Sequence, residues 1–479
     1  MQTLNVVVIG GGITGLTAAL RLRQWSESTK QSENPMDIQC MVCEQSEKFG
    51  GKIRTLKSNR LVIETGPDSI FTRNPAAIEF MQELGLSDDI VQISSSCGTL
   101  VWHDNKLQPL PQGFNTGVPS DLLSLASTEL LSTAGKCRAL EDLFTPGKLS
   151  EQDVSLGEFL RKRLGDELVE VLAAPLLAGI HAGSIDNMSL DANMPVLRQW
   201  YMKHRSLIIG ALQHRHQSSV EEQSPRPTFI SLRGGLIQLI ESLVARLQDN
   251  TDLRLVTQAT SIDRTEDGKY KIFLDNNGHK FSVKADAIIL TTPTYIAAEL
   301  LNRLNPLPET FTQIRYVSTA TITFVYSSTS VPSELAMNGF LIPRVEGCTI
   351  TACTIVSNKW PHTSTEDQVL IRCYVGRDGC QEAVFWSDED LILAAREDLR
   401  RILAITQNPS DIVLKRWNHA MPQYDVGHKE RIDKIYHDLQ KYPGLFVAGA
   451  AYRGVGIPDC ISDAGHTVER LKEYFGQRR

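Results

Sequence analysis

The chain has 479 residues, 42% of them hydrophobic and 22% charged, a composition typical of a globular protein with two or three domains. Its formal net charge of −7 and its pI near 5.9 argue against nucleic-acid binding, which requires a basic surface. No run of about 18 apolar residues is present, and no basic segment precedes the first apolar stretch. We therefore expect a cytoplasmic protein without a signal peptide or a transmembrane segment.

The first apolar run leads directly into a glycine-rich turn. Residues 6–9 are β-branched without a polar break, which predicts a strand buried on both faces of a parallel sheet. Residues 16–23 predict a helix with an apolar stripe. Strand, turn and helix in this order are the context of the dinucleotide-binding fingerprint, in which the helix N-terminus receives a pyrophosphate. The glycine positions of its G-x-G-x-x-G pattern are Gly10, Gly12 and Gly15.

An acidic residue follows the second predicted strand. Residues 38–43 are mostly apolar, and Glu44 comes directly after them, where a carboxylate can accept hydrogen bonds from a ribose hydroxyl. The alternative is a glycine-rich turn that opens an ordinary α/β domain, and the acid favours the nucleotide. Cys40 and Cys43 lie inside this strand, and no second Cys/His pair stands at zinc spacing. We therefore expect reduced thiols and no metal site.

Two elements after Glu44 indicate which nucleotide is bound. Residues 44–55 read E-x(5)-GG-K-I-R-T, which resembles the second element of flavin-dependent amine-oxidase-type enzymes, where paired glycines and a basic residue lie along the FAD diphosphate. Residues 66–69 are Gly-Pro-Asp-Ser, a turn that can present backbone N–H groups to a flavin ring or a phosphate. A plain type I turn is the alternative, and the position after a flavin-type element favours the flavin.

A helix-rich region occupies the next part of the chain. Residues 75–90 predict an amphipathic helix that Pro75 begins. Between residues 95 and 215 helical segments alternate with loops, which predicts an insertion able to cap a substrate site or touch a membrane surface. Residues 216–227 are polar and bounded by proline, and we expect a loop or linker there. The predicted helices of the insertion cover residues 122–131, 135–143, 155–164 and 167–176.

The remaining elements alternate between two predicted domains. A late strand at residues 445–450 precedes a glycine turn, in which Gly454 and Gly456 let the backbone approach an isoalloxazine ring. The dipole of the following helix can stabilise negative charge on that ring. The other predicted elements are helices at 237–247 and 388–405 and strands at 253–256, 270–274, 287–290, 320–326, 339–343, 348–356 and 369–375.

These elements predict an α/β fold. It comprises a Rossmann-like FAD-binding domain of the amine-oxidase type, a mixed β-sheet substrate domain and a helical insertion. The FAD-binding domain is split into residues 1–75, 228–295 and 421–479. Residues 76–215 form the substrate-side and helical insertion, and residues 296–420 form the mixed-sheet substrate domain.

Seven sequence blocks together resemble one enzyme family, the oxygen-dependent porphyrinogen oxidases of haem synthesis. The resemblance spans essentially the whole chain and is nearest to the enzymes of Gram-positive bacteria. The blocks are Gly-Gly-Gly-Ile-Thr-Gly-Leu (10–16), Gly-Gly-Lys-Ile-Arg-Thr (50–55), Glu-Thr-Gly-Pro-Asp-Ser (64–69), Lys-His-Arg-Ser-Leu-Ile (203–208), Lys-Trp-Pro-His (359–362), Met-Pro-Gln-Tyr-Asp-Val-Gly-His (421–428) and Gly-Val-Gly-Ile-Pro-Asp-Cys-Ile (454–461).

The resemblance implies FAD as cofactor and assigns its contacts. The diphosphate is expected at the first glycine turn, the ribose at Glu44, an adenine-side backbone contact at Ser261, and the flavin ring between the 66–69 turn and the C-terminal turn. Cys460 is expected to be a packed thiol beside that turn. The cofactor-binding residues are Gly10, Gly11, Gly12, Ile13, Thr14, Gly15, Glu44, Gln45, Lys52, Gly66, Pro67, Asp68, Ser69, Ser261, Trp417, Gly449, Gly454, Val455, Gly456 and Ile457.

Four residues are the substrate-binding candidates that the resemblance implies. Arg73 and Tyr374 match cavity positions of the family, and Arg377 is a nearby basic candidate. Asn74 departs from the lysine that some relatives carry there, which puts a carboxylate clamp at that point in doubt. The alternatives are a surface charge for Arg73 and an ordinary strand residue for Tyr374.

The implied reaction is the oxidation of coproporphyrinogen III to coproporphyrin III by oxygen, with hydrogen peroxide as co-product. Protoporphyrinogen IX is the alternative substrate. No catalytic side chain is expected, because the flavin carries the chemistry. The expected partners are the porphyrinogen, oxygen, a membrane surface in peripheral contact and the next enzyme of the haem pathway in transient contact. Two rivals remain open: a flavin amine oxidase or desaturase, and a non-catalytic flavoprotein scaffold.

Overall fold

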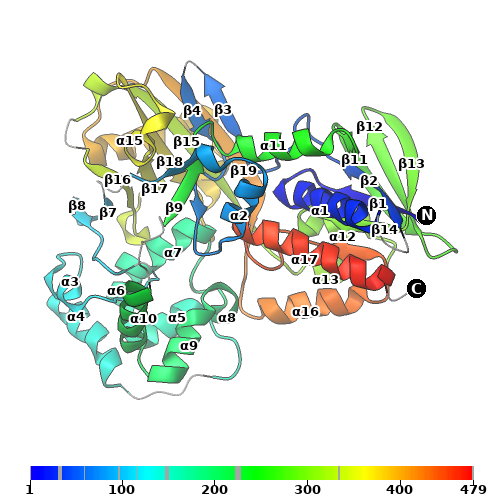
Figure 1. Ribbon diagram of the computed structural model, residues 1–479. Helices are drawn as coiled ribbons and strands as arrows, with labels where there is room; N and C mark the ends of the chain where they lie inside the picture. The colour runs from blue at the N-terminus through cyan, green and yellow to red at the C-terminus, as the bar shows by residue number, and fades with distance from the viewer. Residues whose placement is uncertain are drawn as a thin grey trace.

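A parallel sheet carries the two ends of the chain, at the right of Figure 1. It is part of a computed structural model that describes residues 2–30, 35–58, 60–94, 98–114, 116–145, 150–221, 228–332 and 335–476. Within these residues the sheet has five strands in the order β10-β2-β1-β14-β20, every pair parallel. The strands are β1 (Gln2–Ile9), β2 (Met36–Cys43), β10 (Asp252–Arg254), β14 (Ala287–Leu290) and β20 (Leu445–Val447).

Strand β1 supplies side chains to two cores, as its unbroken apolar run predicts. Val6 and Val8 face one side of the sheet, and Val7 and Ile9 face the other. The first side is covered by α1 (Ile13–Thr29), α11 (Ile237–Leu247) and α17 (Ile457–Gly476). The second side is covered by α12 (Thr294–Leu300), α13 (Leu307–Phe311) and α16 (His428–Leu439).

A mixed sheet forms the second layer, at the upper left of Figure 1. In the described part of the chain it has seven strands, and α15 (Asp388–Leu403) covers one face. The order is β19 (Asp411–Pro422), β15 (Tyr316–Ser327), β18 (Gln368–Val375), β17 (Ile350–Ile355), β16 (Met337–Leu341), β7 (Gly98–His103) and β8 (Lys106–Pro109).

The helical insertion lies at the lower left of Figure 1 and has an apolar core of its own. A π-helical turn at Val169–Ala173 joins two of its helices, and the second of these, α7, packs against β16 and β17. The helices are α3 (Leu122–Ser127), α4 (Thr133–Leu140), α5 (Leu156–Leu164), α6 (Asp166–Leu168), α7 (Ala174–His181), α8 (Leu190–Asn193), α9 (Pro195–His204) and α10 (Leu207–Glu221).

Small elements connect these layers. One antiparallel hairpin precedes the 66–69 turn, and two three-stranded sheets lie beside the parallel sheet. The elements are the hairpin β3 (Thr55–Ser58) and β4 (Leu61–Glu64), the sheet of β5 (Ile70–Phe71), β9 (Phe229–Leu232) and β6 (Ile90–Gln92), the sheet of β11 (Thr257–Arg264), β12 (Tyr270–Asn276) and β13 (His279–Ala285), and the helices α2 (Ala76–Glu83) and α14 (Val356–Lys359).

The expected α/β fold, with a mixed sheet and a helical insertion, is confirmed, while several local predictions differ. The helix expected at 75–90 ends at Glu83, because Gly85 adopts φ +78° and stops it. Residues 98–109 form β7 and β8 and pair into the mixed sheet, where helices and loops were expected. Residues 216–221 continue α10, and the rest of the expected linker lies outside the described residues.

Among the described residues, none of the helices combines the length and the apolar character that crossing a bilayer requires.

Gly15 is sterically required, and we predict that a methyl group there destabilises the fold. A Cβ at Gly15 would lie 1.9 Å from the carbonyl oxygen of Gly10, and neither backbone can withdraw without moving β1 or α1. Gly15→Ala should lower the free energy of unfolding by about 2 kcal/mol or more. Gly465→Ala is the matched control, because a Cβ inside α17 meets nothing within 4 Å. Denaturant unfolding of both variants checks this, and equal stabilities would contradict it.

Candidate functional site

A buried carboxylate fixes the two loops at the carboxyl end of the parallel sheet. Glu44 follows β2, and its Oε2 accepts a hydrogen bond from the backbone N of Gly11 at 2.8 Å. Its Oε1 accepts one from the backbone N of Ser46, also at 2.8 Å. The side chain therefore joins the glycine turn after β1 to the loop after β2, while Gln45 beside it is exposed. Ligands of open α/β sheets bind in the crevice at this end.

The N-terminus of α1 is free of capping side chains. Gly12 is its N-cap residue with ordinary φ of −77°, and no side chain bonds to the first turn. The backbone N–H groups of Ile13, Thr14 and Gly15 have no acceptor within the helix. A Cβ on Gly12 would meet only the Cα of Gly51, at 3.9 Å. This open, positively polarised helix end fits a diphosphate.

Three distant segments meet beside that helix end. A Cβ on Gly449 would lie 3.5 Å from Oγ1 of Thr14, and the Thr14 hydroxyl also lies beside the Cys460 thiol. The ammonium of Lys52 lies near this thiol and has no hydrogen bond or ion pair among the described residues. Burial lowers the pKa of Lys52. An unpaired, half-buried cation next to an open helix N-terminus is a donor set that suits an anionic cofactor.

The 66–69 turn lies against the chain at Lys52. A Cβ on Gly66 would stand 1.8 Å from the carbonyl oxygen of Lys52, so only glycine fits. The indole Nε1 of Trp417, in β19, donates to the carbonyl oxygen of Thr65 at 2.7 Å. Arg372, in β18, donates to the carbonyl oxygen of Gly66. The mixed sheet therefore holds the turn from one side and the Lys52 segment holds it from the other.

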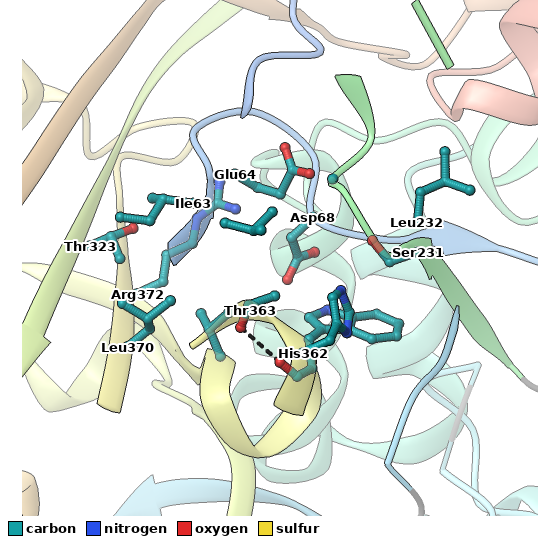
Figure 2. Close-up of a pocket in the computed structure, with 14 residues that line it drawn as sticks. Ile63, Glu64, Asp68, Ser231, Leu232, Thr323, His362, Thr363, Leu370 and Arg372 are labelled. Atoms are coloured by element: carbon teal, nitrogen blue, oxygen red, sulfur yellow. Dashed lines mark hydrogen bonds between the residues drawn. The ribbon is translucent and has the colours of Figure 1, made fainter. Parts of the chain in front are cut away.

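Buried charges stand behind this turn, and Figure 2 shows Asp68 and Arg372 around a common pocket. Asp68 accepts a hydrogen bond from the Nζ of Lys359 at 3.1 Å, and Lys359 Nζ lies 3.3 Å from the Oγ of Ser69. Burial alone would raise the pKa of Asp68, but the charges of Lys359 and Arg372 lower it to about 2. Arg372 is 3% exposed, and its Nε and Nη1 have no partner among the described residues.

Glu64 is a second acid at the same pocket. Its Oε1 accepts a hydrogen bond from the backbone N of Leu236 at 2.6 Å, and its Oε2 accepts one from the Oγ1 of Thr55 at 2.9 Å. Burial raises the pKa of Glu64 to about 7, and these two hydrogen bonds oppose the increase. Unlike Asp68, this carboxyl therefore carries a proton below neutral pH.

The C-terminal turn is held by its own helix. The backbone N of Gly449 donates to Oδ2 of Asp463 at 2.8 Å, and that of Gly456 donates to Oδ2 of Asp459 at 3.2 Å. Gly454 adopts φ +145°, a conformation that favours glycine. Val455 and Ile457 complete the turn, and Ile457 begins α17.

The substrate candidates lie at different places. Asn74 donates from Nδ2 to Oδ1 of Asp459 at 3.2 Å, which brings it to the C-terminal turn. The Oη of Tyr374 lies 3.3 Å from the Oγ1 of Thr354 in β17. Tyr374 itself belongs to β18, the strand whose Arg372 bonds to the 66–69 turn. Arg73 is exposed just before α2.

Two candidates stand apart from this group. Arg377 is buried beyond the end of β18, and its Nη1 donates to the carbonyl oxygen of Ile342 at 3.3 Å. Burial and the charge of Arg344 lower its pKa. Ser261 lies on β11 just after a bulge, in the sheet beside the parallel sheet. Among the described residues, neither forms a hydrogen bond with the glycine turns.

Arg372 and Lys359 are charged residues that sequence reasoning did not assign to the site. Arg372 interrupts the otherwise apolar strand at Gln368–Val375, and an arginine inside such a run signals a buried partner. Lys359 belongs to one of the family-like blocks, but no spacing rule connects it to Asp68, which lies far away in the sequence.

Comparison with known proteins identifies relatives over the full length. The family described as flavin-containing amine oxidoreductase matches residues 13–472. The chain is 37% identical over 476 residues to the coproporphyrinogen III oxidase of Bacillus subtilis, covering 98% of each chain. It is 32% identical over 477 residues to that of Staphylococcus aureus, covering 98% of this chain and 99% of the other.

A solved structure agrees with these relatives. A protein from Exiguobacterium sp. 255-15, described in its crystal structure as a candidate protoporphyrinogen oxidase, superimposes with a TM-score of 0.87. It is 35% identical, and the match covers 99% of each chain.

Glu64 should make the stability of the protein depend on pH. The native state holds a proton up to about pH 7, whereas the unfolded state releases it near 4.5, so stability falls as pH rises between these values. The loss for this group is roughly 3 kcal/mol. Glu64→Gln can still accept from Leu236 N with its amide oxygen and can donate from its amide nitrogen to Thr55 Oγ1, and it should remove this slope. Denaturant unfolding from pH 4.5 to 8 checks it, with the exposed Glu389→Gln as control, and an unchanged slope in Glu64→Gln would refute the assignment.

Proposed function

The chain belongs to the flavin-containing amine oxidoreductase family, and we propose that this oxidoreductase converts coproporphyrinogen III to coproporphyrin III with FAD as cofactor and oxygen as acceptor. The observation that carries the proposal is similarity over the whole length of both chains to coproporphyrinogen III oxidases. The blocks at 203–208 and 421–428 lie outside the flavin elements and favour a porphyrinogen over an amine.

The FAD site that we propose uses the open elements of the structure. The diphosphate would accept hydrogen bonds from the free N–H groups at the start of α1. A ribose hydroxyl would donate to the remaining lone pairs of Glu44. The ammonium of Lys52, which has no ion-pair partner among the described residues, would balance the negative charge of the diphosphate. The ring side of the site is bounded by the 66–69 turn, Trp417 and the turn at Gly449 to Ile457.

Bound FAD would supply a hydride acceptor, which is the chemistry that oxidising the sp³ bridges of a porphyrinogen requires. The protein then needs to orient the substrate and exclude water, and it needs no strong base, because a pyrrole nitrogen stabilises the cation that forms. We propose that Asn74, Tyr374 and Arg73 border the substrate, since Asn74 and Tyr374 lie near the turns that bound the ring side. The setting of Arg377 favours a structural role over a propionate contact.

Protoporphyrinogen IX remains a second candidate substrate, because the Exiguobacterium protein described as a candidate protoporphyrinogen oxidase is 35% identical over 99% of both chains. The two porphyrinogens differ in the number of propionates, so charge recognition separates them.

Parallel turnover of the two porphyrinogens tests the proposal. The purified holoprotein should convert coproporphyrinogen III to a fluorescent porphyrin and release one peroxide for each two-electron step, with a higher kcat/KM than for protoporphyrinogen IX. Porphyrin fluorescence and peroxide are measured together, with putrescine as a control amine. Turnover of the amine without turnover of either porphyrinogen would refute the proposal.

Gly12→Val should separate cofactor binding from folding. A side chain is sterically tolerated at Gly12, whose φ is ordinary and whose Cβ would meet only Gly51, but it would fill the space above the helix N-terminus. The variant should unfold like the wild type without cofactor and retain less than about a tenth of the flavin. Absorbance near the flavin band of the purified protein measures retention. A variant as yellow as the wild type would contradict the proposed diphosphate site.

A further inference from the structure

The block at residues 421–428, here called the linking segment, lies between two parts of the molecule. It comprises the last residues of β19, a short connection and the first residue of α16. On one side lies the helical insertion, and on the other lies the C-terminal turn that contains Gly454. The proposed function gives the residues of this block no contact with the cofactor or the substrate.

Backbone and amide bonds tie the linking segment to the helical insertion. The carbonyl oxygen of Tyr424 accepts hydrogen bonds from the backbone N of Ser189 and from Nδ2 of Asn193, both at 2.8 Å. The Nε2 of Gln423 donates to the carbonyl oxygen of His181, the last residue of α7, at 3.2 Å. Further bonds join Val426 N to Asn187 O at 3.0 Å and Gly427 N to Oδ2 of Asp153 at 2.9 Å.

The side chain of Tyr424 reaches the opposite side. Its hydroxyl donates to the carbonyl oxygen of Ala450 at 2.8 Å and accepts from the backbone N of Gly454 at 2.7 Å. The ring is 7% exposed and stacks on His428, with centroids 3.8 Å apart and planes 12° apart. The hydroxyl therefore bridges the two ends of the turn while the stacked ring prevents it from swinging away.

We propose that Tyr424 is a positioning residue that couples the helical insertion to the turn beside the flavin. Its backbone carbonyl is held by Asn193 of α8 and by Ser189, the residue that precedes α8. Its hydroxyl holds the C-terminal turn. A shift of the insertion, which packs over β16 and β17 through α7, is therefore transmitted to the ring side of the cofactor site. This inference rests on the proposed function, because it assigns Gly454 to the neighbourhood of the flavin.

Tyr424→Phe tests the hydroxyl with little change in packing. It leaves Gly454 N and Ala450 O without a partner, so FAD should dissociate with a Kd about tenfold higher. It should also shift the absorption spectrum of the bound flavin. Tyr326→Phe is the matched control, because Tyr326 is 1% exposed and lies in the core of the mixed sheet, outside every segment assigned to the cofactor site. That control should retain the wild-type Kd and spectrum.

Asn193→Leu tests the coupling from the other side. This residue belongs to α8, and its variant should raise the KM for coproporphyrinogen III several-fold and weaken FAD binding through Tyr424. In a double-mutant cycle, its effect on the FAD Kd should disappear when Tyr424 is already phenylalanine, while its effect on KM remains.

The outcomes separate this inference from the proposed function. Wild-type protein that binds no FAD or oxidises no porphyrinogen would end the proposed function. If the wild type does both, two results overturn the role of Tyr424: an FAD Kd in Tyr424→Phe equal to that of Tyr326→Phe, or an equal effect of Asn193→Leu in both backgrounds. A lower unfolding midpoint with an unchanged Kd would also overturn it, because it indicates a structural role alone.

Discussion

Direct backbone-to-backbone contact is the constraint on which the site depends. Gly15 lies on the carbonyl of Gly10, and Gly66 lies on the carbonyl of Lys52, at distances that exclude any side chain. The backbone N of Gly50 also bonds to the carbonyl of Gly11 at 2.8 Å. These contacts bring the 10–15, 50–52 and 66–69 segments to one edge of the parallel sheet, where the N-terminus of α1 has no side-chain cap.

Charge is distributed around these turns in a definite way. The helix N-terminus and Lys52 make one side positive, while Asp68, Lys359 and Arg372 form a buried cluster behind the ring side. Asp68 stays ionised because two cations face it, whereas at Glu64 burial outweighs two neutral hydrogen-bond donors and the charge of Arg372, so that its pKa is about 7. Neighbouring carboxyls thus differ in charge through their environments.

The sequence predicted the elements whose signal is local. The parallel sheet, α1, α15 and α17 follow from apolar runs and glycine turns, although α1 begins three residues before and ends six residues after the predicted 16–23. Strand β7 was missed because its partner β16 lies far along the chain, and pairing of that kind leaves no periodic signal. Strand β8, which pairs only with β7, was missed together with it. Likewise Arg372 and Lys359 reach Asp68 only through the fold, so no spacing predicted the cluster.

Because β20 is the outer strand of the parallel sheet and α17 covers α1, the first domain to be synthesised is the last to be finished. Until the final segment has left the ribosome, the apolar face of α1 that receives Ile461, Ala464 and Val468 has no cover. The growing chain must therefore shield that face, by a chaperone or by transient collapse. A nascent chain that stops before residue 457 would lack α17 and would leave the apolar face of α1 exposed to quality-control factors. It would also lack the helix that holds the C-terminal glycine turn.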